Sequence, residues 1–128
     1  METEEMMTCA AMEYAKSQFD AEQIDDKDLY QNSVEFCVQV FKDGAGWAAQ
    51  NPKSSFDKAE KAAAKYAKEN ADSADNGIVD EISTDFIEGV EWYFIEVTHR
   101  WSRKPITVAG YDGYQIVENL PWWKRIFG

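Results

Sequence analysis

The feature that most constrains the fold is a period-two alternation of side chains in residues 33–42, SVEFCVQVFK. Val34, Phe36, Val38 and Val40 would share one side of an extended chain, because successive side chains of a strand point to opposite faces. The pattern predicts a strand with one covered face. Such a strand needs a sheet to pair in and an apolar layer to cover it.

Turn signals after this run predict a short hairpin. Asp43-Gly44 indicates a turn, and residues 46–50, GWAAQ, can return as a second strand. Asn51-Pro52 then ends that strand, because proline cannot donate to a ladder.

A second group of strand signals lies toward the C-terminus. Residues 90–101, VEWYFIEVTHRW, are rich in aromatic and β-branched side chains and predict a long strand. We expect a turn near residues 102–105 that leads into residues 106–111, ITVAGY. Asp112-Gly113 is typical of a two-residue hairpin turn and leads to residues 114–118, YQIVE. These signals predict three successive antiparallel strands.

Helical periodicity marks three other stretches. Residues 3–22 have apolar side chains at helical spacing and acids in the first turn. Residues 55–70 carry an apolar stripe with lysines outside, preceded by a capping-box pattern of Ser54 and Asp57. Residues 78–88 are ambiguous, but fit a helix that Gly89 would end.

Together these elements predict an α+β fold. We expect an antiparallel sheet of about four to five strands, with two or three helices packed on one face. The length of 128 residues suits a single domain, 1–128, in which residues 119–128 form a short aromatic and basic C-terminal tail.

Composition favours a globular protein. Hydrophobic residues make up 45% of the chain, which argues against intrinsic disorder despite a formal net charge of −11. No apolar run is long enough to span a membrane, and the acidic N-terminus is unlike a secretory signal. With only two cysteines there is no disulfide framework, so we expect a cytoplasmic protein.

Catalytic and metal-binding patterns are absent from the sequence. His99 is the single histidine, and with a neighbouring carboxylate it is the only acid–base candidate. Cys9 and Cys37 lack the paired spacing of a zinc site. Residues 72–83 resemble a calcium loop in part, but Ala74 and Ser83 occupy ligand positions. We therefore predict a non-enzymatic protein without metal or cofactor.

Charge is arranged in blocks, and one block suggests a binding surface. Residues 69–96 hold nine acids and no lysine or arginine. A surface of one sign selects partners of the opposite sign. We predict docking on a protein with a basic surface, possibly a nucleic-acid-binding protein, as inhibitors, immunity proteins and nucleic-acid mimics do, and no direct binding of nucleic acid. The residues predicted to form the acidic face are Asp80, Glu81, Asp85, Glu88 and Glu91.

The C-terminal sequence PWWKRIFG suggests an alternative function. It is similar to the short membrane-targeting tails of bacterial division-site ATPases, which implies contact with a membrane surface, although no P-loop lies upstream. The tail could instead pack on its own domain or insert into a partner. The alternative to an acidic docking module is a peripheral membrane or complex-anchoring protein. Its anchor residues would be Trp122, Trp123, Lys124, Arg125 and Phe127.

Overall fold

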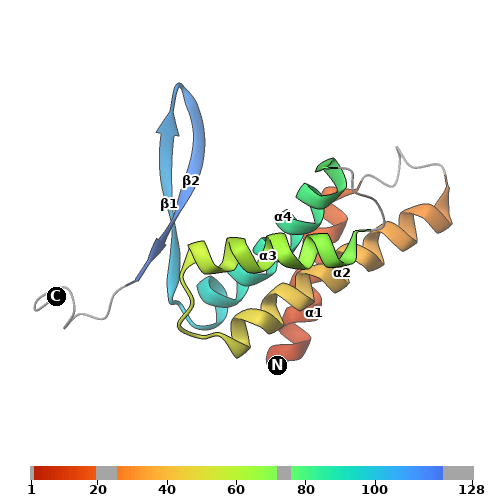
Figure 1. Cartoon of the computed structure of the whole chain (residues 1–128), viewed down its shortest axis with the longest axis horizontal. Helices are drawn as coiled ribbons and strands as arrows, with labels where there is room; N and C mark the ends of the chain where they lie inside the picture. The colour runs from red at the N-terminus through yellow and green to blue at the C-terminus, as the bar shows by residue number, and fades with distance from the viewer. Residues whose placement is uncertain (1, 20–25, 72–75, 120–128) are drawn as a thin grey trace, which may run out of the picture.

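The fold is mostly helical, and the predicted α+β sheet is wrong. The computed structural model describes residues 2–19, 26–71 and 76–119. Within these residues, four helices are followed by one π-helical turn, η1, and a single two-stranded hairpin (Figure 1). The elements are α1 (Thr3–Gln18), α2 (Lys27–Gln50), α3 (Phe56–Asn70), α4 (Asn76–Trp92), η1 (Tyr93–Val97), β1 (Trp101–Val108) and β2 (Tyr111–Glu118).

The run that predicted the first hairpin forms the long helix α2. Residues 33–42, the expected turn at Asp43-Gly44 and the expected strand 46–50 are all helical. The correct period was also present, because the buried side chains recur three and four residues apart, whereas Phe36 is 48% exposed. Asp26 caps the helix N-terminus, and Asn51-Pro52 ends a helix rather than a strand. The buried residues of α2 are Val34, Cys37, Val40, Phe41, Gly44, Ala45 and Ala48.

The predicted long strand 90–101 is likewise helical over most of its length. The helix predicted for residues 78–88 continues through Gly89 to Trp92 and then widens into η1, where the Thr98 N–H donates to the Tyr93 carbonyl. The buried residues Ile82, Phe86, Val90 and Phe94 recur every four positions. The aromatic and β-branched side chains of residues 90–101 predicted a strand wrongly, because the same side chains can also fill the buried face of a helix.

Two glycines that suggested a turn and a helix stop instead form the crossing of α2 and α4. A Cβ atom added to Gly44 would lie 2.0 Å from the Phe86 carbonyl oxygen. A Cβ atom added to Gly89 would lie 2.0 Å from the carbonyl oxygen of Phe41. Only glycine permits this reciprocal approach, so tertiary packing explains both residues.

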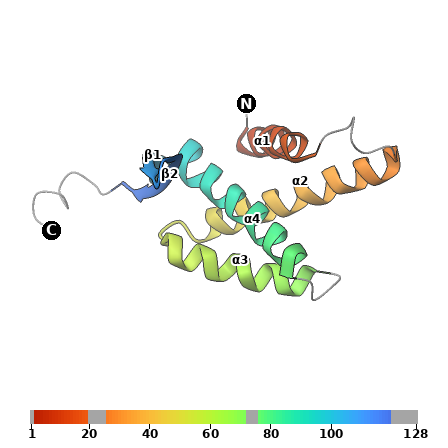
Figure 2. The ribbon, with the colours of Figure 1, turned by 90° about the horizontal axis from the view of Figure 1, so that it is seen from above.

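The helices at residues 3–22 and 55–70 are confirmed as elements, and the details differ. α1 ends at Gln18, and residues 20–22 lie outside the described residues. The cap of α3 is Ser55, whose Oγ accepts a hydrogen bond from the Lys58 N–H, so the Ser54–Asp57 capping box is wrong. α2 and α4 cross in the middle of the molecule, with α1 on one side and α3 on the other (Figure 2).

The C-terminal hairpin exists, but its turn is three residues earlier than predicted. Ala109 and Gly110 both have positive φ, at 53° and 82°, and connect the pair Val108–Tyr111. Asp112-Gly113 and residues 102–105 therefore lie within strands. This register lets the buried Trp101 begin the ladder opposite Glu118.

The base of the hairpin is docked on the helices through Trp101. This side chain is 1% exposed, and its ring centroid lies 4.6 Å from that of Phe94 and 5.7 Å from that of Phe56. Arg100 Nη1 donates to the carbonyls of Pro52 and Ser54, at 2.5 and 2.9 Å. Beyond this base the hairpin projects away from the helices (Figure 1).

Candidate functional site

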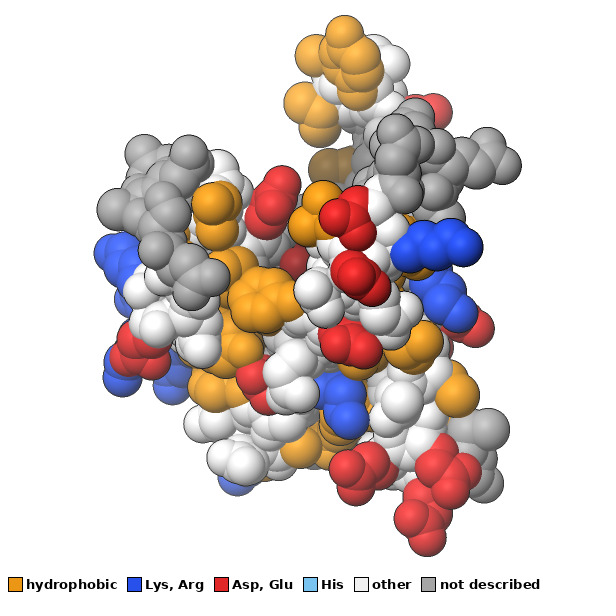
Figure 3. Space-filling model, turned by 90° about the vertical axis from the view of Figure 1, so that its right-hand side faces the viewer, with side chains coloured by type: hydrophobic (Ala, Val, Ile, Leu, Met, Phe, Trp, Pro, Cys, Tyr) orange, Lys and Arg blue, Asp and Glu red, His pale blue; other side chains and the backbone are white. Residues whose placement is uncertain are grey.

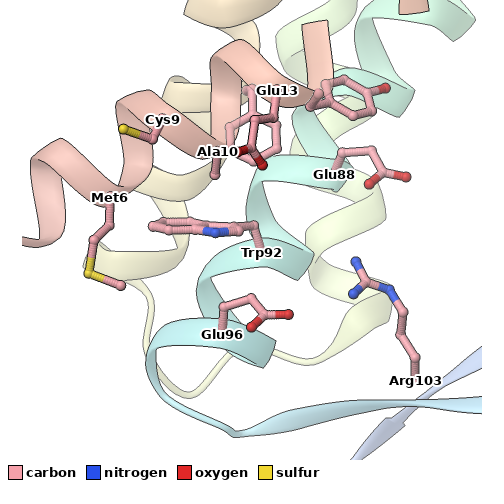
Figure 4. A pocket seen from close by; sticks show the side chains of 10 residues that line it. Met6, Cys9, Ala10, Glu13, Glu88, Trp92, Glu96 and Arg103 are labelled. Atoms are coloured by element: carbon pink, nitrogen blue, oxygen red, sulfur yellow. The ribbon is translucent and has the colours of Figure 1, made fainter. Parts of the chain in front are cut away.

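An open groove lies between α1 and the C-terminal part of α4. Its volume is about 650 Å³, and β1 closes one end through Arg103 (Figure 4). The floor is apolar, because the ring of Trp92 lies 6.2 Å from that of Phe41, which lies 5.5 Å from that of Tyr14. The lining residues are Met6, Cys9, Ala10, Glu13, Tyr14, Phe41, Glu88, Trp92, Glu96 and Arg103.

The walls of the groove carry carboxylates from two elements that face each other. Glu13 comes from α1, while Glu88 and Glu96 come from α4 and η1 (Figure 4). Among the described residues that line the groove, Arg103 is the one cation. Burial raises the pKa of Glu88, and the nearby Asp85 carboxylate raises it further, against the lowering effect of Arg103. The groove therefore holds more negative charge than its own cation balances.

Asp85 joins three helices. Tyr14 of α1 donates a 2.7 Å hydrogen bond to Asp85 Oδ1, and the thiol of Cys37 on α2 also donates to this carboxylate. Burial, together with the charge of Asp85, raises the pKa of Cys37 to about 12, so the thiol stays protonated. Burial also raises the pKa of Asp85 itself, although both hydrogen bonds oppose the change. This carboxylate is therefore partly buried and hydrogen-bonded within the fold.

Glu91 is a buried acid with one distant cationic partner. The residue is 4% exposed, and Arg103 Nη2 lies 3.9 Å from its Oε2 atom. Within the described residues, no hydrogen bond reaches Oε2. Burial, with the charge of Glu88, raises the pKa of Glu91 to about 7. The sequence suggested an exposed docking residue at this position, but the side chain lies in the protein interior.

The remaining two predicted acids are exposed. Asp80 and Glu81 line a second, smaller cavity of about 250 Å³ at the start of α4, beside Gln18, the last residue of α1, and the following Phe19. All five predicted acids thus lie on α4, in four different environments. In the view of Figure 3, acidic and hydrophobic side chains lie interleaved on the surface.

Sequence reasoning missed Glu13 and Glu96 as groove residues. Glu96 belonged to a predicted strand, and Glu13 belonged to an acidic block 75 or more residues before α4's C-terminal part. The helical spacing of Glu88, Trp92 and Glu96, each four residues apart, was the available signal for the α4 side.

Other candidate chemistry finds little geometric support. His99 is exposed in the link between η1 and β1, where its carbonyl accepts a hydrogen bond from Asn119. In residues 2–19, 26–71 and 76–119, no group of three or more potential ligands is arranged to hold a metal ion. The tail anchor residues Trp122, Trp123, Lys124, Arg125 and Phe127 lie outside the described residues.

No helix in the described part of the chain is both long and apolar enough to cross a membrane. Comparison of the chain with protein-family models, with curated proteins and with solved structures found no match in any of the three.

Proposed function

We propose that the protein is a small binding module that docks on a basic protein partner through the groove between α1 and α4. The observation that carries this proposal is a groove with an apolar floor, three carboxylates on its walls and one cation. Such a site favours a segment that presents lysine or arginine beside a large apolar side chain. The module would act in the cytoplasm as an inhibitor, an immunity protein or a nucleic-acid mimic. It would bind its partner without catalysing a reaction.

The structure changes which acids an experiment should alter. Glu91 is buried, and Asp85 accepts a hydrogen bond from Tyr14, so reversing either charge would disturb the fold. A loss of binding could then result either from the changed charge or from the damaged fold. Glu13 and Glu96 are exposed at the groove, so their side chains can change without opening the core.

The test compares two double charge reversals of equal net charge. Glu13→Lys with Glu96→Lys alters the groove, whereas Glu35→Lys with Glu60→Lys alters exposed positions on α2 and α3. The probe is a fluorescent amphipathic peptide with lysines on one helix face and leucines on the other. The groove variant should lose about tenfold or more in affinity, a change of about 1.4 kcal/mol. Equal losses in both variants would show a net-charge effect and contradict the proposal.

The tail supports a second candidate function, which rests on its sequence of two tryptophans and two cations. Aromatic side chains bury apolar area at a membrane interface, and each cation adds on the order of 1 kcal/mol near anionic lipid. Deleting residues 121–128 should then abolish sedimentation with anionic vesicles while leaving the melting temperature unchanged. Unchanged sedimentation would contradict membrane anchoring.

A further inference from the structure

The projecting hairpin has two edges, and they differ in their capacity to pair. The two-residue turn makes Val108–Tyr111 a hydrogen-bonded pair, and such pairs alternate along an antiparallel ladder. A hydrogen bond of 2.7 Å from the Asn119 N–H to the Arg100 carbonyl confirms this alternation at the base. The backbone nitrogens of residues 101, 103, 105 and 107 therefore point away from β2, and the N–H groups of residues 112, 114, 116 and 118 point away from β1.

Proline interrupts one of these edges. One of the four outward positions of β1 is Pro105, which has no backbone N–H to donate. The outward edge of β2 keeps every donor and acceptor. All residues of β2 except Ile116 are exposed, and the hairpin beyond its base projects away from the helices (Figure 1). The edge of β2 is thus accessible and has all its backbone donors and acceptors. Such an edge can pair with an added strand.

Large apolar side chains lie along the same part of the hairpin. Tyr111 is 80% exposed, Tyr114 is 48% exposed and Val117 is 37% exposed. A two-stranded hairpin alone buries little apolar surface and is marginally stable, whereas three or more strands are stable. The exposed side chains therefore suit a larger sheet than one chain forms.

We propose that the edge of β2 pairs with the β2 edge of a second copy of this chain, which creates a four-stranded antiparallel sheet with the order β1-β2-β2-β1. An edge is its own complement about a two-fold axis, so a second copy is the partner that this geometry fits. The axis passes through Tyr114. This inference is independent of the groove between α1 and α4.

Side-chain complementarity selects that register. With Tyr114 on the axis, Tyr111 lies opposite Val117 of the second copy, so two exposed apolar side chains gain partners. Asp112 then lies opposite Ile116 of the second copy, and Glu118 lies opposite Gly110 of the second copy. Moving the axis by one residue, to position 115, would place Asp112 opposite Glu118 of the second copy, where like charges repel. Because each chain has a formal net charge of −11, two copies repel each other. Salt should therefore strengthen the dimer by screening this repulsion.

The first test places proline on each edge in turn. Sedimentation velocity of the full chain in high salt should show a concentration-dependent dimer. Tyr114→Pro removes an outward donor on the axis and should raise the dimer dissociation constant about tenfold or more. Thr107→Pro removes an outward donor from β1 and should leave the constant within about twofold. A monomer at every concentration, or a dimer lost only in Thr107→Pro, would overturn the proposal.

The second test checks the register by charge exchange. Tyr111→Lys with Val117→Lys places two lysines opposite each other and should abolish the dimer. Tyr111→Glu with Val117→Lys places opposite charges there and should restore it. Far-UV circular dichroism establishes that the helices are intact in every variant. Equal dissociation constants for the two double variants would overturn the proposed register.

Discussion

The two flanks of α4 are packed by opposite means. On the α2 side, Gly44 and Gly89 bring the two backbones together so closely that neither position can hold a Cβ atom. On the α1 side, the carboxylates of Glu13 and Glu88 face each other across a groove of about 650 Å³. Helix α4 therefore packs against α2 through glycines on one flank, and it carries charged side chains that line a groove on the other.

This difference separates stability from recognition. The glycine crossing excludes water and leaves no room for variation, which is the property of a protein interior. The groove keeps polar groups accessible over an apolar floor, which is the property of a binding surface. Changes to the α2 flank should alter the free energy of unfolding, whereas changes to exposed groove residues should mainly alter binding.

The largest expected effect comes from filling the glycine crossing. Gly89→Ala places a methyl group against the Phe41 carbonyl and Gly44→Ala places one against the Phe86 carbonyl, so the helices must move apart. Each change should lower the free energy of unfolding by about 3 kcal/mol or more. Urea denaturation followed by far-UV circular dichroism measures this loss.

Gly46→Ala is the matched control in the same helix. A Cβ atom at position 46 meets nothing within 4 Å. Alanine should therefore stabilise α2 by about 0.5–1 kcal/mol through its better helix propensity. If Gly44→Ala and Gly46→Ala had the same effect, the close crossing of α2 and α4 would be contradicted.

Those glycines also show why the sequence predicted the wrong fold class. Locally, Asp43-Gly44 is a sound turn signal and Gly89 a sound helix stop. Their role depends on a residue about 45 positions away in the chain, which local reasoning cannot include. The lysine-faced helix α3 was predictable because its apolar stripe and solvated face are both local features.

The candidate site was predictable in part for the same reason. The cation-free block identified the acids of α4, but their environments depend on what packs against each turn. Glu91 is buried beside Arg103 of β1, whereas Asp80, about three helical turns earlier in α4, is exposed. No sequence pattern separates the two residues. Glu13 entered the site only because α1 lies beside α4.

Glu91, at the junction between α4 and the hairpin, should make the stability of the protein depend on pH. The pKa of Glu91 is about 7 in the folded protein and 4.5 for the unperturbed group. Between these values the folded state binds more protons than the unfolded state, so stability falls as pH rises. The Glu91 contribution to this loss should be about 3 kcal/mol, complete above pH 7.

Glu91→Gln isolates this contribution from the rest of the acidic surface. The variant should be more stable than the original protein above pH 7, and its stability should depend less on pH, because no buried charge forms. Glu81→Gln removes an exposed acid from the same helix and should leave the slope nearly unchanged. Thermal unfolding between pH 4.5 and 8 measures both. An unchanged slope in Glu91→Gln would show that Glu91 titrates normally.

The smallest expected effect tests how α1 is held beside the groove. Tyr14→Phe removes the hydroxyl that donates to Asp85 while the ring contact with Phe41 remains. Loss of this hydrogen bond should cost about 1–2 kcal/mol, because Asp85 is left partly buried with the Cys37 thiol as its remaining donor. It should also raise the pKa of Asp85, since the lost hydrogen bond favoured the carboxylate. Tyr111→Phe alters an 80% exposed tyrosine and should be neutral. NMR titration measures the pKa of Asp85, and thermal unfolding measures the stability of the variant. Unchanged stability together with an unchanged pKa of Asp85 would mean that the ring of Tyr14, rather than its hydroxyl, joins α1 to α4.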